Sequence, residues 1–270
     1  MRRTVLAMAM VVAAHGAQAA DYPEDLPILR GSVRDGVIPR WQGVYIGGQA
    51  GTGSSDMNFS NATSAMVASL LNGTTIEGDG QASKWPVLGK VSQKGNGFGG
   101  FVGYNSQWDD VVLGIEANYM HGSFGGNTSG TMSRFFTDSN NFTDYVDYTA
   151  AAQFKITDMG SVRARAGYAW GSFLPYMFGG VSLGQANVMK SATVSGTQVN
   201  NNPPNQIVPF SVSATESQNN RFIYGYAAGL GVDVMLGGGL FMRGEWEYLK
   251  FVGPIDTSIN TVRGGLGYRF

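Results

Sequence analysis

The chain ends in NTVRGGLGYRF, residues 260–270, and this stretch decides the fold. Its apolar face carries Val262, Leu266, Tyr268 and Phe270 together with Gly264. The other face carries Thr261, Arg263, Gly265, Gly267 and Arg269. A period of two predicts a β-strand, and an apolar face that closes on an aromatic favours a barrel strand against lipid. Because a strand of a soluble sandwich can show the same alternation, other parts of the chain must decide between the two.

The N-terminus predicts export from the cytoplasm. Arg2 and Arg3 precede the short apolar run Val5–Ala14, and Ala17–Ala19 has the small residues of a cleavage site. This order is typical of a secretory signal peptide, which we expect to cover residues 1–20. The apolar run is too short to count as a membrane span.

After the signal, residues 21–40 carry three prolines among charged residues and show no periodicity. We interpret them as a flexible periplasmic linker that leads into a barrel at residues 41–270. No other run of about 18 apolar residues occurs, so a mature chain in a membrane must cross it as a closed barrel.

Composition excludes several classes of function. Without Arg2 and Arg3, the 18 basic residues become 16 against 19 acidic ones, so the mature net charge is about −3 and nucleic acid is not expected as a partner. The absence of cysteine excludes disulfides and thiolate metal sites. His121 is the only histidine outside the signal, so a histidine-rich metal site is excluded, and we expect no cofactor and no metal.

Eight alternating segments follow the linker, and their connections alternate in length. We predict strands at 42–51, 95–107, 111–120, 150–170, 174–186, 222–235, 240–250 and 258–270. Short turns fall at 108–110, 171–173 and 236–239, whereas long loops fall at 52–94, 121–149, 187–221 and 251–257. Short turns on one side and long loops on the other predict an all-β, eight-stranded antiparallel up-and-down transmembrane barrel with long extracellular loops. A ninth strand, made by splitting 150–170 at Asp158, would break this sorting.

The alternation places most charged residues of the strands on the inward face. The predicted lumen network comprises Glu116, Arg163, Arg165, Asp233, Arg243, Glu245, Glu247, Arg263 and Arg269. An eight-stranded barrel is only wide enough for its own side chains, so these charges must pair with one another or with trapped water. A narrow conducting path or gate is the alternative. The fifth strand leaves its facing open, because Tyr176 and Phe178 alternate with Met177 and Val181.

Five motifs carry a resemblance to a known family. They are Trp41–Gly48, Gly114–Glu116, Ser161–Trp170, Leu174–Gly180 and Gly267–Phe270. In this order they resemble the small outer-membrane β-barrel proteins of alphaproteobacteria, a porin-like family related to the opacity-type surface proteins. The resemblance implies a noncatalytic barrel of the cell outer membrane that contributes to the envelope and presents its loops outward.

The same resemblance implies partners. They are outer-membrane lipids, lipopolysaccharide and the outer-membrane assembly machinery, which would read Leu266, Tyr268 and Phe270 as its signal.

Three functions stay open at the level of sequence. The leading one is envelope structure and surface interaction through the Asn-, Ser- and Thr-rich loops. The second is a narrow channel or a barrel for ligand uptake, for example of haem. The third is lipid modification, since His121 and Ser123 place a base and a hydroxyl two residues apart at the outer rim, in a His-x-Ser order similar to that of a lipid A deacylase. No orienting acid can be assigned from the sequence, so we predict no catalytic residue and no enzyme.

Overall fold

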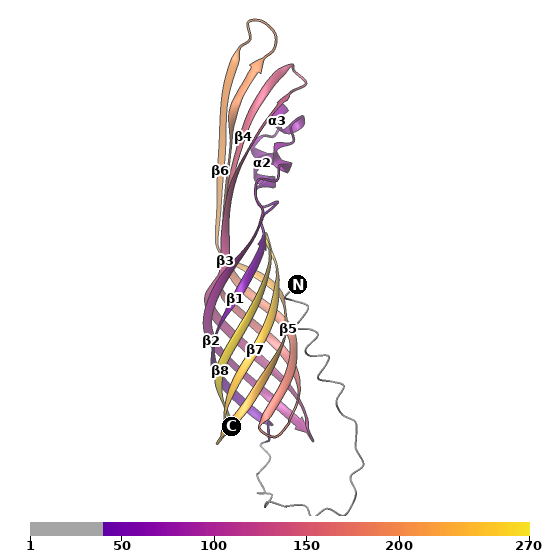
Figure 1. Ribbon diagram of the computed structural model, residues 1–270, viewed down its shortest axis with the longest axis vertical. Coiled ribbons are helices and arrows are strands. Elements are labelled where there is room, and N and C mark those ends of the chain that lie inside the picture. Colours follow the sequence, from indigo (N-terminus) through magenta and orange to yellow (C-terminus); the bar gives the residue numbers. More distant parts are fainter. Residues whose placement is uncertain (1–39) are drawn as a thin grey trace, which may run out of the picture. The chain divides into compact units, whose positions relative to one another are not determined.

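The computed structural model describes residues 40–270, so the predicted signal and nearly all of the predicted linker lie outside the described part. Eight antiparallel strands close into a barrel in sequence order, as predicted, with β8 pairing back onto β1 (Figure 1). The strands are β1 (Gly43–Asn58), β2 (Lys90–Trp108), β3 (Val111–Thr137), β4 (Phe142–Tyr168), β5 (Phe173–Asn200), β6 (Ile207–Gly237), β7 (Leu240–Val252) and β8 (Asp256–Arg269). No helix in residues 40–270 is long and apolar enough to cross a membrane.

The short turns fall where the sequence predicts them, on the periplasmic side. Asp109, Gly238 and Gly239 adopt positive φ angles of 51°, 59° and 87°, which tight reversals require. The last residue continues the pairing, since the Phe270 N–H donates to the Val44 carbonyl at 2.9 Å. The barrel therefore has no open edge within the membrane.

The predicted long loops at 121–149 and 187–221 are wrong as loops. β3 and β4 continue to a turn at 138–141, and β5 and β6 continue to a turn at 201–206, so both connections are extended hairpins (Figure 1). Their outer parts, residues 124–137, 142–156, 186–200 and 207–221, form one four-stranded sheet, here called the outer sheet.

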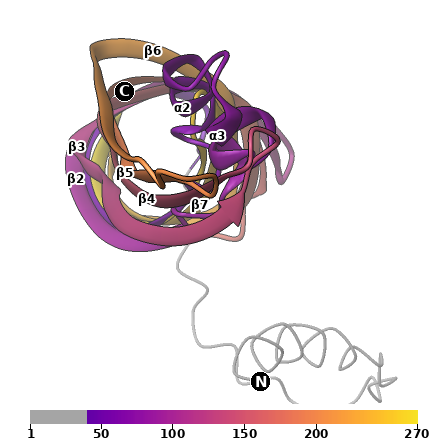
Figure 2. The same ribbon diagram turned by 90° about the horizontal axis from the view of Figure 1, so that it is seen from above.

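The predicted loop at 52–94 is also shorter than expected, because β1 and β2 take up both of its ends. The residues between them, 59–89, are here called the cap. The cap holds the helices α2 (Ser64–Leu70) and α3 (Thr75–Gly78) and the 3-10 turn η1 (Ala82–Lys84). Seen from above, α2 and α3 lie beside the long strands, and α2 contacts β5 and β6 (Figure 2).

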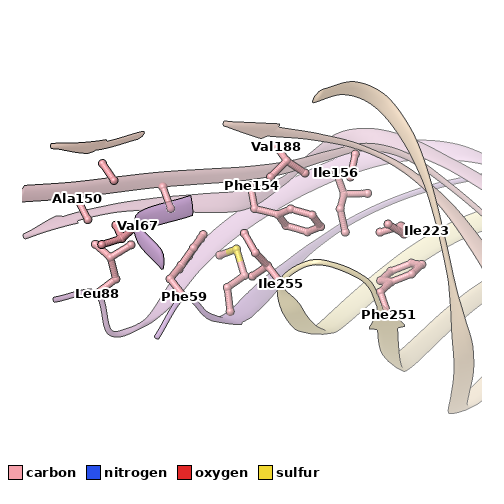
Figure 3. Close-up of a cluster of buried hydrophobic side chains, with 14 of the residues drawn as sticks. Phe59, Val67, Leu88, Ala150, Phe154, Ile156, Val188, Ile223, Phe251 and Ile255 are labelled. Carbon is pink, nitrogen blue, oxygen red and sulfur yellow. The ribbon is translucent and has the colours of Figure 1, made fainter. Parts of the chain in front are cut away.

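One face of the outer sheet is apolar and packs on the cap. Tyr148, Phe154 and Ile156 of β4 are at most 1% exposed, as are Phe59 and Val67 of the cap (Figure 3). The hydroxyl groups of Thr63 and Tyr148 share a hydrogen bond of 2.7 Å across this interface. At roughly 1.5–3 kcal/mol for each fully buried large side chain, this packing is what turns the two predicted loops into strands.

The opposite face of the outer sheet carries hydroxyl groups in rows across the strands. One row joins Thr131, Thr149, Thr193 and Ser213 through consecutive pairings. Thr131 and Thr149 share a hydrogen bond of 3.0 Å between their hydroxyl oxygens. This polar face looks into water while the apolar face is covered, which is the usual arrangement of an antiparallel sheet outside a membrane.

Register shifts mark the junction between the barrel and the outer sheet. They fall at Ile156/Asp158 in the β4–β5 pairing and at Ala186/Val188 in the β5–β6 pairing. Thr157 is the extra residue of β4, and in β6 Asn220 adopts a φ of 57° at the second shift. Such bulges change the alternation of a strand. β4 therefore buries even-numbered residues before Thr157, in the outer sheet, and odd-numbered residues after it, in the barrel.

Candidate functional site

Eight of the nine predicted lumen charges gather in one buried cluster, each at most 4% exposed. Arg163 is its centre. The Arg163 Nη2 atom lies 2.5 Å from Glu116 Oε1 and 2.6 Å from Glu245 Oε1, and Nη1 lies 3.4 Å from Glu247 Oε1. All three glutamates therefore contact this guanidinium.

Further ion pairs extend the cluster on both sides of Arg163. Arg243 Nε lies 2.8 Å from Asp233 Oδ1, and Arg243 Nη1 lies 2.7 Å from Glu116 Oε2. Arg165 Nη2 lies 2.8 Å from Asp233 Oδ2, and Arg263 pairs with Glu247. Four arginines thus face four carboxylates, so the buried charge is balanced and no member is left without an opposite charge.

Aromatic side chains complete the cluster, and the sequence did not reveal them. The guanidinium carbons of Arg163, Arg165 and Arg243 lie 3.9, 3.8 and 3.9 Å from the ring centres of Phe178, Tyr176 and Phe101 respectively. The Tyr176 hydroxyl donates to Glu245 Oε1 at 2.6 Å, and the Tyr45 hydroxyl donates to Glu116 Oε2 at 2.8 Å. These contacts settle the facing of the fifth strand. Tyr176 and Phe178 point inward, whereas Met177 and Val181 are 62% and 67% exposed.

Apolar layers close the lumen on both sides of the charges. The periplasmic layer is formed by Trp41, Phe101, Leu174 and Phe241. The outer layer contains Ile223, Leu249, Phe251 and Ile259, and it runs on into the core between the outer sheet and the cap (Figure 3). The interior of this barrel is therefore filled with side chains, as expected for eight strands.

Arg269 lies apart from the cluster. Its Nη1 atom donates to the carbonyl of Gln42 at 2.9 Å, next to the end of the chain, and it is only half-buried. It faces inward by alternation but sits at the periplasmic rim, too far along β8 to reach the carboxylates. The other end residues singled out in the sequence, Leu266, Tyr268 and Phe270, all lie on the outward face and are 56%, 44% and 73% exposed.

At the outer rim the structure supplies an acid that the sequence could not assign. His121 Nδ1 lies 2.8 Å from Asp158 Oδ1, and the Tyr119 hydroxyl donates to the same oxygen at 2.5 Å. Asp158 and His121 stand directly opposite each other in the β3–β4 register. Within the described residues, Ser123 makes no side-chain hydrogen bond to His121. The group is therefore a rim cluster of Tyr119, His121 and Asp158 between two strands, and Ser123 lies outside it.

The fold and the lumen together define an outer-membrane β-barrel. The family model for the outer membrane protein beta-barrel domain matches residues 4–270, and the chain belongs to this family. It is a protein of the outer membrane.

The chain also has measurable similarity to individual known proteins. The chain is similar to the 25 kDa outer-membrane immunogenic protein of Brucella ovis, with 24% identity over 188 residues, or 70% of each protein. Among solved structures it is similar to OprG of Pseudomonas aeruginosa, with 13% identity, a TM-score of 0.39 and coverage of 85% of this chain and 96% of that one. Similarity to Ail of Yersinia pestis has 16% identity, a TM-score of 0.35 and coverage of 84% and 99%.

Proposed function

We propose that this protein supports the outer membrane as a filled barrel and mediates surface interactions through the outer sheet and the cap. The observation that carries the proposal is the pairing of a filled lumen with an ordered module outside the membrane. Balanced buried charges lie between two apolar layers, so the interior serves to hold the barrel together.

Two features support interaction as the role of the outer module. Its strands are continuous with those of the barrel, so its surfaces are held on a rigid scaffold. Its core is built from large apolar side chains of the cap and β4. Solvated loops without fixed structure would not need such a core. The relative in Brucella ovis carries the name of an immunogenic protein, which is consistent with a surface-accessible module.

The proposal assigns neither conduction nor catalysis. A conducting path would have to pass both apolar layers, and dry apolar constrictions oppose ion passage. Planar-bilayer recording of the purified protein tests this part. We expect no stepwise conductance, and reproducible steps would contradict a purely structural lumen.

The surface role is tested by removing the outer module while keeping the barrel. The variant replaces residues 59–89, 124–156 and 187–221 with short turns that keep the barrel registers. We expect it to insert and to show heat-modifiable migration like the parent, while antibodies raised against the outer sheet no longer label intact cells. If the parent protein were equally unlabelled and protease-resistant on intact cells, the surface role would be wrong.

Envelope support is tested separately by comparing detergent sensitivity of three strains. Cells without the protein should be more sensitive than the parent, and the barrel-only variant should restore resistance. Failure of the barrel-only variant to restore it would assign envelope support to the outer module instead.

A further inference from the structure

The outer part of β6 leaves one backbone edge unpaired. Residues 207–221 pair with β5, but the ladder with β7 begins only at the pair Tyr224 and Val252. Along this stretch the structure gives no backbone hydrogen bond to any third strand among the described residues. A row of free N–H and C=O groups at a sheet edge is a template for another extended chain.

This edge has few of the features that usually protect an edge. Between Ile207 and Asn220 the only charged residue is Glu216, which lies 3.8 Å from Lys190 on the neighbouring strand, and Pro209 stands at the far tip. The opposite edge of the outer sheet is treated differently. There the cap lies against β3, with the carbonyl oxygen of Val87 close to Gly130. Of the two edges, β6 is the one left open.

A pocket with one apolar side adjoins the same edge on the side of the cap. It has a volume of about 460 Å³, and its apolar side lies between the cap residues Leu70, Leu71 and Ile76 and the β6 residues Phe210 and Val212. Its polar side is lined by Thr74, Thr75, Asp138, Asn140 and Gln198. Phe210 and Val212 are only partly buried although they pack on the core. A strand edge beside a helix and an apolar pocket is the arrangement that recognises extended peptides elsewhere, where the backbone supplies affinity and the pocket selects a side chain.

We propose that β6 binds an extended peptide strand of a partner protein, which adds to the outer sheet and places an apolar side chain in this pocket. The inference rests on the proposed surface role and names the class of partner. Side chains of an added strand alternate between the two faces, so every second one points toward the cap. The partner segment therefore has apolar residues at alternate positions and small polar ones between them, matching the hydroxyl-rich outer face.

A second copy of the chain fits this edge less well. β6 runs from the tip toward the membrane, so two copies in one membrane would bring their edges together in the same direction. Such a parallel pair is somewhat less stable per residue than an antiparallel one. An antiparallel pair of β6 strands would require two membranes facing each other. An extended segment from another protein has neither constraint.

The test uses the mature protein in lipid nanodiscs and a labelled peptide of nine alternating threonines and valines, with a lysine at each end. We expect saturable binding by fluorescence anisotropy and slower amide hydrogen exchange in residues 207–218. The same peptide N-methylated at every residue cannot donate hydrogen bonds from its backbone and should not bind. Val212→Lys places a charge beside the pocket and should weaken binding at least about tenfold, by the cost of burying an unpaired charge.

Thr149→Lys is the matched control, because it adds the same charge to the outer sheet on the polar face of an inner strand. We expect unchanged binding, and exchange rates in β4 and β5 verify that both variants remain folded. Equal binding of the N-methylated peptide, or protection outside residues 207–218, would overturn the inference. Clustering of protein-bearing vesicles that the peptide cannot compete away would overturn it in favour of a second copy. A module labelled on intact cells that binds no peptide would keep the proposed function and remove this inference alone.

Discussion

The outer sheet continues four of the eight strands of the barrel, but the two regions place their apolar side chains on opposite sides. In the barrel part of β4, Val162 is 61% exposed toward lipid while Arg163 is buried. In the outer part of the same strand, Phe154 is buried under the cap while Lys155 is exposed. In both regions buried and exposed side chains alternate along the strand with the same period of two. The difference teaches that the surrounding solvent, lipid or water, decides which half of an alternating strand faces outward.

The largest loss of stability is expected from a change at the centre of the lumen. Arg163→Met leaves the carboxylates of Glu116 and Glu245 without their main partner, and removing one member of a buried pair costs about 3–5 kcal/mol. We expect that loss in urea unfolding of the protein in lipid vesicles. The double variant with Glu116→Gln should lose less than the sum of the two single changes. Additive losses would show that the cluster is not a coupled network.

The core beneath the cap tests whether the outer module unfolds on its own. Phe154→Ala opens a cavity in that core, and such changes cost about 3–5 kcal/mol. We expect faster amide exchange in the outer sheet and the cap, with unchanged exchange in barrel residues such as those of β7. Loss of protection throughout the chain would show instead that barrel and module form one cooperative unit.

The outward faces of the barrel and of the outer sheet can be compared directly, because an outward-facing residue can be changed to arginine in each. Leu230→Arg places a charge on the outward face of β6 within the membrane and should cost about 2–4 kcal/mol. Thr149→Arg places one on the outward face of the outer sheet, where water solvates it, and should change stability by less than about 0.5 kcal/mol. Both are measured by refolding titration in vesicles. Equal losses of stability would contradict the assignment of Leu230 to a lipid-facing surface and Thr149 to a water-facing one.

The chain end separates assembly from stability. Phe270 packs edge-on against Tyr268 with ring centres 5.1 Å apart, yet it is 73% exposed, so its deletion should cost only about 1 kcal/mol in purified protein. In cells we expect the truncated protein to accumulate in the periplasm or be degraded. Normal outer-membrane levels would show that the terminal aromatic is an ordinary strand end.

The smallest expected effect concerns a buried acid near the tip of the outer sheet. Burial raises the pKa of Asp144, although a hydrogen bond from Gln198 acts in the opposite direction. A carboxyl whose folded pKa lies above its unfolded value favours folding when protonated, so its contribution falls as the pH rises through that range. Asp144→Asn should therefore stabilise the module slightly at neutral pH, and the gain should vanish in acid. Chemical denaturation followed across pH 3–7 checks this, and a gain independent of pH would contradict it.

The sequence alone was sufficient for the barrel. Eight strands follow from the strict alternation of β7 and β8 and from the three short turns. Of the nine inward charges predicted from the alternation, eight lie in the cluster. Arg269 was misplaced because alternation gives the face of a strand but not the depth at which a side chain lies. The neutral aromatics Tyr45 and Tyr176 cannot be recognised as lumen residues from sequence, because an aromatic side chain occurs as often on the lipid face of a barrel strand as on its inner face.

The outer sheet could not be predicted, for a different reason. Its segments are rich in Ser, Thr and Asn, which are as frequent in loops as on a strand face exposed to water. The apolar half of the pattern, Val146, Tyr148 and Phe154, becomes visible as a strand only when the cap supplies a surface to bury it. In addition, Thr157 shifts the alternation of β4 at the junction, so no single pattern runs through the whole strand.

The continuity of β3–β6 from membrane to tip also has a mechanical meaning. At roughly 3.3 Å per residue, the 15 or so outer residues of β5 carry the tip about 45–50 Å beyond the junction. A pull on the tip along the strands loads many ladder hydrogen bonds at the same time, in shear, since they lie perpendicular to the strands. Force applied by a bound partner would thus be passed directly into the barrel wall, and the bulges near Thr157 and Asn220 are the places where the ladder would yield first.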